Sequence, residues 1–152
     1  MTSRHGGLLR ILLVEDNPDH AELIRRGFAE NSDRVQLTVM PDGEAAVGYL
    51  FRRGPWAEPG SSPRPHLILL DLRLPKLDGF QVLQEVKDSP ELCQIPTVIL
   101  TTSEAETDMA KAYARHANSY LVKPVDFERF VSLVGDIEGY WLEWNRQPAA
   151  SA

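Results

Sequence analysis

The stretch HLILLDLRLPKLDGF, residues 66–80, places one carboxylate, Asp71, directly behind four consecutive apolar residues. An unbroken run of Leu and Ile is typical of a strand that is covered on both faces, as in a parallel sheet. A charged group at the end of such a strand is costly unless other groups pair with it. The sequence therefore predicts partners for Asp71 at the same edge of a sheet.

Outward from this stretch, apolar runs alternate with amphipathic stretches along the whole chain. This alternation is typical of repeated βα units, in which helices cover both faces of a parallel sheet. It predicts a doubly wound α/β fold with five strands and five helices. The expected strands cover residues 8–14, 35–40, 67–70, 97–100 and 119–122.

Capping residues predict where the helices begin. Asn17 followed by Pro18 offers a cap and a first-turn proline, and Ser103 with Glu106 three residues later predicts a capping box. Three aspartates are the expected caps of the other helices: Asp42, Asp78 and Asp126. The segment 52–65 contains four prolines and two glycines, which predicts an exposed loop that Trp56 packs onto the body of the protein.

Composition limits the function classes. A chain of 152 residues with 43% hydrophobic and 25% charged residues is typical of one soluble domain. A formal net charge of −6 argues against non-specific binding to nucleic acid, which requires a basic face. The apolar run near the N-terminus is too short for a signal peptide or a membrane span, so we expect a cytoplasmic protein without a membrane partner.

Cysteine and histidine offer little metal chemistry. The single cysteine, Cys93, excludes an intramolecular disulfide and fits a reducing compartment. The histidines are far apart and lack ligand spacing, so all four are expected to be surface residues: His5, His20, His66 and His116.

Polar groups end four of the expected strands. Ligands of open α/β sheets collect at the carboxyl ends of the strands, where this chain places Glu15 with Asp16, Asp71, Thr101 and Lys123. Three crowded carboxylates repel one another unless a cation is present, and a hard divalent ion such as Mg²⁺ prefers oxygen ligands. Read alone, each residue has a structural explanation as a cap, a strand residue or a surface charge. The set on different strand ends favours a site in which an aspartate accepts a phosphoryl group.

Four motifs in this order resemble the receiver domain of two-component response regulators: ILLVEDNPDH, LILLDLRLPKLDGF, VILTTS and SYLVKPVD. The resemblance covers about residues 8–144, leaves 1–7 and 145–152 as flexible termini, and implies a flavodoxin-like sheet. It implies that a sensor histidine kinase phosphorylates Asp71. It also implies that Asp16, Asp71 and the carbonyl of Arg73 bind Mg²⁺, with Glu15 reaching the ion through water.

The same resemblance implies a switch. Thr101 would hydrogen-bond the phosphoryl group, Lys123 would form an ion pair with it, and Tyr120 would turn inward when the threonine moves. Phosphate contacts would then bias two states of the surface near the fourth helix and fifth strand.

Three other functions can be weighed against this one. A metal-dependent phosphatase needs a second acid two residues after the nucleophile, where this chain has Arg73. A flavin or nucleotide module needs a glycine-rich loop after the first strand, where this chain has Glu15-Asp16-Asn17-Pro18. A degenerate receiver, or a phosphate sink without phosphorylation-dependent output, stays open.

The last helix predicts an interface. A stripe that would cover the sheet comprises Phe127, Phe130, Val131, Val134, Ile137, Trp141 and Leu142. Leu133, Tyr140 and Trp144 widen this stripe to roughly 200°, about twice what a surface helix needs. We expect a homodimer through this helix, because aromatic residues are enriched in interfaces. The aromatic helix and the long loop resemble stand-alone regulators that are paired with bacterial phytochromes, which implies a light-sensing kinase.

Overall fold

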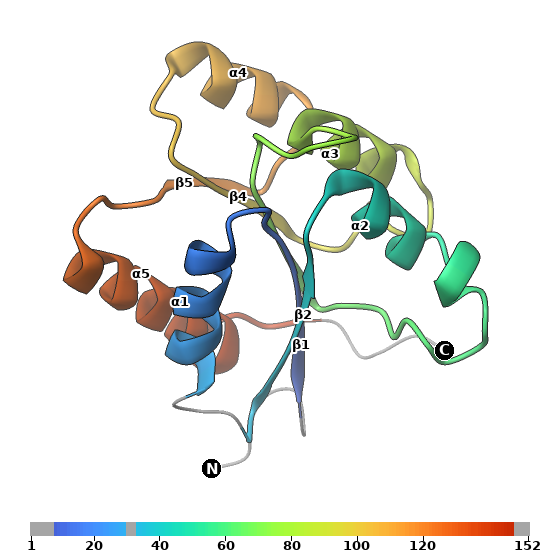
Figure 1. Cartoon of the computed structure of the whole chain (residues 1–152), viewed down its shortest axis with the longest axis horizontal. Helices are drawn as coiled ribbons and strands as arrows, with labels where there is room; N and C mark the ends of the chain where they lie inside the picture. The colour runs from blue at the N-terminus through green and yellow to red at the C-terminus, as the bar shows by residue number, and fades with distance from the viewer. Residues whose placement is uncertain (1–7, 30–32, 148–152) are drawn as a thin grey trace.

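The computed structural model describes residues 8–29 and 33–147, which form one five-stranded sheet with helices on both faces (Figure 1). All strand pairs are parallel, and the strand order is β2-β1-β3-β4-β5. The strands are β1 (Leu9–Val14), β2 (Val35–Met40), β3 (Leu67–Leu70), β4 (Thr97–Thr101) and β5 (Ser119–Val122), and the helices are α1 (Pro18–Ala29), α2 (Gly43–Leu50), α3 (Gly79–Asp88), α4 (Glu106–Ala114) and α5 (Phe127–Gly139). This order is the flavodoxin-like one, and it confirms the predicted doubly wound fold.

Two apolar layers sandwich the central strands. Helices α1 and α5 lie against one face of the sheet, and α2, α3 and α4 lie against the other (Figure 1). Leu67 and Leu69 of β3 pack in the first layer, whereas Ile68 and Leu70 pack in the second. All four are fully buried, which explains why the strand is an unbroken apolar run.

The register of the strands determines which residues meet at their carboxyl ends. Val14 of β1 pairs with Leu70 of β3, so Glu15 and Asp71 leave the sheet side by side. Thr101 ends β4 and pairs with Val122 of β5, the residue before Lys123. The residues predicted to form a site therefore emerge from one edge of the sheet.

Most predicted helix caps are present. Asn17 Oδ1 accepts hydrogen bonds from two first-turn N–H groups of α1, and the side chains of Asp42, Asp78 and Asp126 cap their helices. The predicted capping box at Ser103 is wrong: α4 begins after Ala105, and Ser103 Oγ donates instead to Asp108 Oδ2 at 2.7 Å. The same hydroxyl oxygen accepts from the backbone N–H of Ala105 at 3.3 Å, so Ser103 closes the turn that precedes α4 and does not cap the helix.

The proline-rich connection between α2 and β3 packs onto the body of the domain. It contains a 3₁₀ turn, η1 (Gly54–Trp56), whose tryptophan ring meets the ring of Tyr49 edge-on with a centroid distance of 5.1 Å. The hydroxyl of Tyr49 donates to the carbonyl of Pro63 across the same loop. The prediction that Trp56 anchors the loop is confirmed.

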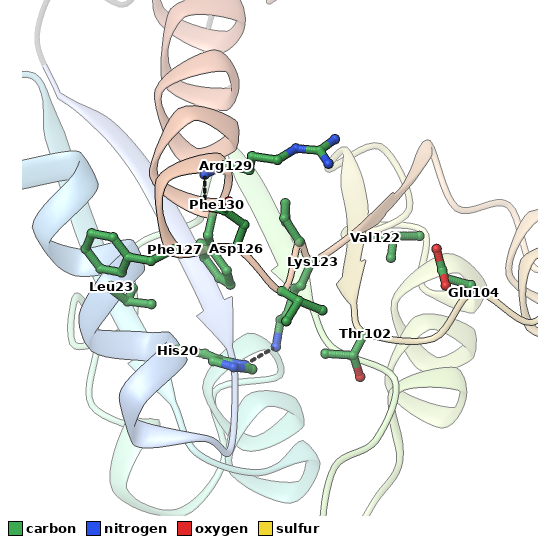
Figure 2. A pocket seen from close by; sticks show the side chains of 12 residues that line it. His20, Leu23, Thr102, Glu104, Val122, Lys123, Asp126, Phe127, Arg129 and Phe130 are labelled. Carbon is green, nitrogen blue, oxygen red and sulfur yellow. Dashed lines mark hydrogen bonds between the residues drawn. The ribbon is translucent and has the colours of Figure 1, made fainter.

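The C-terminal helix covers the sheet with part of its predicted stripe. Phe130, Val134 and Ile137 are buried, and a π turn, η2 (Tyr140–Trp144), continues the helix. Placing Phe127 in the covered stripe was wrong, because its side chain is 61% exposed in the first helical turn. It lines a cavity of about 760 Å³ between α1 and the start of α5 (Figure 2).

The predicted flexible ends mostly fall outside the described residues, since 1–7 and 148–152 are not described. Within 145–147, Gln147 Nε2 donates to the carbonyl of His66 at 3.1 Å. Across the described ranges 8–29 and 33–147, no helix has the length and apolar character needed to cross a membrane.

Candidate functional site

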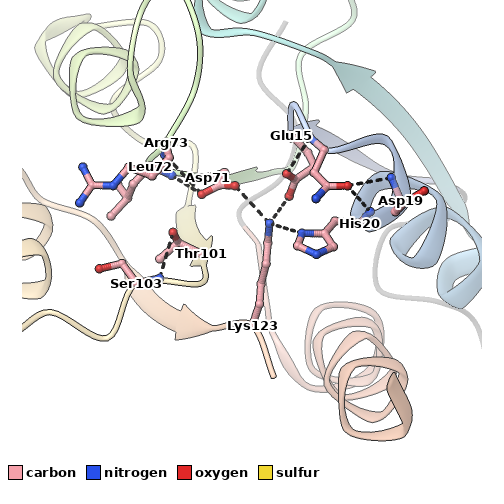
Figure 3. A network of polar contacts seen from close by, with 10 residues as sticks. Glu15, Asp19, His20, Asp71, Leu72, Arg73, Thr101, Ser103 and Lys123 are labelled. Atoms are coloured by element: carbon pink, nitrogen blue, oxygen red, sulfur yellow. Dashed lines mark hydrogen bonds and ion pairs between the residues drawn. The ribbon is translucent and has the colours of Figure 1, made fainter. Parts of the chain in front are cut away.

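Asp71 follows β3, and both of its carboxylate oxygens have partners. Oδ1 accepts from the backbone N–H of Leu72 at 2.7 Å and lies 3.4 Å from that of Arg73. Oδ2 lies 3.1 Å from Lys123 Nζ (Figure 3). The loop after the strand therefore orients the carboxylate, which is the pairing that a charge at a buried strand end requires.

Lys123 is the cation of the site. Its side chain and that of Glu15 are each only 1% exposed, and its ammonium group contacts Glu15 Oε1 as well as Asp71. Burial raises the pKa of Glu15 from 4.5 to about 7, while the hydrogen bond and the charge of Lys123 oppose this shift. Burial therefore destabilises the charged form of the carboxylates in this pocket, and the positive charge of Lys123 offsets part of this effect.

The carboxylates fit a divalent cation. Among the described residues, Glu15, Asp16 and Asp71 each offer a ligand oxygen, and these oxygens all lie within 4.8 Å of one another. The donor set consists of oxygen atoms alone, two of the three carboxylates are buried, and Asp16 is exposed to solvent. A hard ion suits such a set, and the exposed member leaves a route of entry.

Two further residues predicted for this site lie on the next strands. Thr101 is fully buried at the end of β4, and its Oγ1 is 3.5 Å from the backbone N–H of Ser103. The hydroxyl of Tyr120, on edge strand β5, donates to the carbonyl of Ser103 at 3.0 Å. The loop between β4 and α4 therefore touches both predicted switch residues.

The side chain of Arg73 lies outside the carboxylate cluster. Its guanidinium forms an ion pair with Asp108 Oδ2 at 2.6 Å, and Asp108 also accepts from Ser103. The loop that follows the strand of Asp71 is thereby tied to the first turn of α4. Sequence reasoning missed this link, because residues 73 and 108 share no motif.

His20 was also missed, and the prediction that it is a surface residue is wrong. Its Nδ1 lies 3.0 Å from Lys123 Nζ (Figure 3). Its ring packs against Phe130 of α5 (Figure 2). The signal that could have found it is its position four residues after Asp16, in the first turn of the helix that follows the first strand. His66 is half-buried as well, and its Nδ1 accepts from the backbone N–H of Arg10 at 2.8 Å.

The predicted interface residues lie elsewhere. Tyr140 and Trp144 are 53% and 77% exposed at the far end of α5, and Leu133 is half-buried. Leu133 and Tyr140 line a groove of about 610 Å³ beside the edge of the sheet. The structure does not bring these residues to the carboxylates.

Comparison with known proteins identifies the motif set. Residues 11–135 match the family model of the response regulator receiver domain. Over 138 residues the chain is 47% identical to the probable methanogenesis regulatory protein FilR2 of Methanothrix harundinacea, covering 91% of this chain and 86% of that protein. Over 140 residues it is 42% identical to the response regulator Rcp1 of Synechocystis, covering 92% and 93% of the two chains.

Solved structures agree with these sequence matches. The Mn²⁺-bound form of Rcp1 superimposes with a TM-score of 0.86 at 41% identity, covering 92% of this chain and 99% of that one. The phosphorylated cyanobacterial phytochrome response regulator RcpA superimposes with a TM-score of 0.88 at 38% identity, covering 93% and 99%. The fold and the motif set are therefore shared over nearly the whole chain.

Proposed function

This chain belongs to the response regulator receiver domain family, and we propose that Asp71 is the residue on which it accepts a phosphoryl group from a sensor histidine kinase. The chain is a phosphorylation-activated response regulator of a two-component system. The observation that carries the choice of Asp71 is its carboxylate, which backbone N–H groups hold at Oδ1 and Lys123 contacts at Oδ2.

In the proposed step, an oxygen of Asp71 attacks the phosphorus of a phosphohistidine. The bond from phosphorus to the imidazole nitrogen breaks, the nitrogen keeps the electron pair, and an acyl phosphate forms on Asp71. Lys123 pairs with the charge on the phosphoryl oxygens. Asp16, Asp71 and the carbonyl of Arg73 would hold Mg²⁺, with Glu15 reaching the ion through water, and the bound ion would neutralise further phosphoryl charge. The protein acts as a switch and not as a turnover enzyme.

The loop between β4 and α4 would transmit the signal from Asp71 to the surface of the protein. When Thr101 turns toward the phosphoryl group, its neighbour Ser103 moves with it. The hydrogen bond from Tyr120 to Ser103 then breaks or carries the ring inward. Either outcome reshapes the surface that α4 and β5 present, which is how a local charge becomes a signal.

A small phosphodonor tests the acceptor residue. Incubation with acetyl phosphate and Mg²⁺ should add one acid-labile phosphoryl group, seen by intact-protein mass spectrometry. Asp71→Asn should abolish it, because an amide oxygen is a poor nucleophile toward phosphorus. Asp88→Asn changes an exposed aspartate at the end of α3 and should label like the wild type. Labelling that persists in Asp71→Asn would contradict the proposal that Asp71 is the acceptor.

We propose that the kinase is phytochrome-type. The support is the similarity to RcpA, which is described as a cyanobacterial phytochrome response regulator, and to Rcp1. The similarity to FilR2, named for methanogenesis, shows that the same receiver scaffold also occurs in another pathway. Phosphotransfer from a phytochrome-type kinase, measured beside the small-donor reaction, tests this pairing separately from the chemistry of Asp71.

We also propose a homodimer through the end of α5, where Tyr140 and Trp144 are exposed next to the groove that Leu133 lines. Replacing both aromatic residues with Ser should weaken the dimer by at least about tenfold, because aromatic residues dominate interface energies. Light scattering at micromolar concentration measures this effect with and without phosphorylation. Tyr113→Ser removes an equally exposed aromatic residue from α4 and should leave the dimer intact. A wild-type monomer in both states would defeat the idea.

A further inference from the structure

Three acceptors surround the ammonium group of Lys123. They are Glu15 Oε1, Asp71 Oδ2 at 3.1 Å and His20 Nδ1 at 3.0 Å. A lysine ammonium has three N–H donors and no acceptor, so each donor has one partner. The contact with His20 is therefore a hydrogen bond in which the imidazole accepts at Nδ1 and carries its own proton on Nε2.

The protein fixes His20 in this orientation from two sides. Its backbone N–H donates to Asn17 Oδ1 in the cap of α1. Its ring packs against Phe130 of α5 with a centroid distance of 5.6 Å. Burial, with the charge of Lys123, lowers the pKa of His20 and keeps the imidazole neutral. The position of the His20 imidazole is therefore set by contacts within α1 and with α5, and not by the carboxylates.

We propose that His20 is a positioning residue that holds Lys123 in line with Asp71 through the neutral acceptor Nδ1. This inference rests on the proposed role of Asp71. The two carboxylate partners of Lys123 are also members of the acidic cluster that can ligate a cation, so their oxygens serve two purposes. His20 is not a member of that cluster, so its Nδ1 stays available to the lysine when the carboxylates ligate a cation.

Neutrality is the reason why an imidazole suits this position. Lys123 already contacts two carboxylates, and the proposed reaction brings a phosphoryl group with further negative charge. An acidic side chain at position 20 would add to the repulsion that the phosphoryl group meets. A neutral acceptor orients the lysine without reducing its attraction for that group.

Two substitutions separate hydrogen bonding from packing. His20→Leu keeps an apolar side chain of similar size and removes the acceptor, and it should slow labelling by acetyl phosphate and Mg²⁺ about tenfold, the effect of losing one hydrogen bond to a charged group. His20→Asn places Oδ1 near the former position of Nδ1 and should label within about threefold of the wild type. Thermal unfolding checks that each variant is folded, and His20→Met, which has no nitrogen or oxygen acceptor either, takes the place of a Leu variant that does not fold.

A second measurement needs no phosphorylation. Long-range ¹H–¹⁵N correlation spectra of the metal-free wild type should show His20 protonated on Nε2 and unprotonated on Nδ1. A proton on Nδ1, or a Leu variant that labels as fast as the wild type, overturns the proposal. If the wild type is never labelled, the role of Asp71 fails, and the tautomer still decides whether His20 accepts from Lys123.

Discussion

Replacing Lys123 with Met will destabilise the metal-free protein by about 3–5 kcal/mol at pH 8, the usual cost of removing one partner from a buried ion pair. The ammonium group is buried between Glu15 and Asp71, and the loss leaves these two carboxylates together with no cation. A methionine fills much of the space of the lysine stem, so the deficit measures charge more than packing.

The deficit will depend on pH in a definite direction. The pKa of Glu15 in the folded protein, about 7, lies above its ordinary value of 4.5, so the folded state binds this proton more tightly than the unfolded state. The contribution of Glu15 to the free energy of unfolding therefore falls as the pH rises from 4.5 to about 7. Without Lys123 the pKa of Glu15 rises further, so this fall extends to higher pH, and the variant approaches wild-type stability as the pH is lowered toward 5.

Urea unfolding in EDTA and in Mg²⁺ measures both effects. A divalent cation should restore most of the lost stability, because it binds the folded carboxylates and replaces the missing positive charge. Lys76→Met is the control: Lys76 is 60% exposed and 3.7 Å from Asp42, so its loss should cost less than about 1 kcal/mol, with no dependence on Mg²⁺. Wild-type stability of Lys123→Met in EDTA would contradict the paired-charge description of this site.

Gly79→Ala is expected to cost about 3 kcal/mol, as in other cases where a tight site must accept an extra methyl group. A Cβ at this position would lie 2.2 Å from the carbonyl oxygen of Asp71 and 2.6 Å from the Cα of Leu72. Both are backbone atoms, so they cannot move without displacing the loop that orients the Asp71 carboxylate. Stability and phosphorylation should therefore fall together.

Chemical denaturation and acetyl phosphate labelling check this prediction, with Gly135→Ala as the matched control. A Cβ at Gly135 of α5 meets no atom within 4 Å. Alanine is the better helix former, so this control should gain about 0.5–1 kcal/mol. If Gly79→Ala behaves like Gly135→Ala, the close approach of α3 to the end of β3 does not constrain the site.

The fold was predictable from the sequence because buried strands and helix starts each leave a local pattern of residues in the chain. The strand at 67–70 was read from four apolar residues, and its burial on both faces follows from a central place in a parallel sheet. The aspartate caps at 42, 78 and 126 were read from local chemistry, which acts within a few residues. The wrong cap at Ser103 arose because α4 begins two residues later than the capping box requires, with Ala105 at the N-cap position. Ser103 Oγ accepts from the N–H of Ala105 and donates to Asp108 instead.

The site residues at strand ends were predictable from the sequence. Those whose contacts depend on how side chains of different elements pack were not. Glu15, Asp71 and Lys123 end their strands, so topology alone brings them together. His20 sits on a helix, and its contact with the lysine depends on the packing of its ring against Phe130 from another helix. The exposure of Phe127 was misjudged because a helical wheel does not show where the edge of the sheet ends.

The ion pairs of Lys123 also have a consequence for the folding of the chain. They join the lysine to Asp71 across 52 positions of sequence and to Glu15 across 108. Contacts of such separation form late, because the intervening chain must first be ordered. A partly folded chain would therefore hold Asp71 without the ammonium group that pairs with it in the folded protein. If Asp71 accepts the phosphoryl group as proposed, phosphorylation would require that β1, β3 and β5 have already assembled.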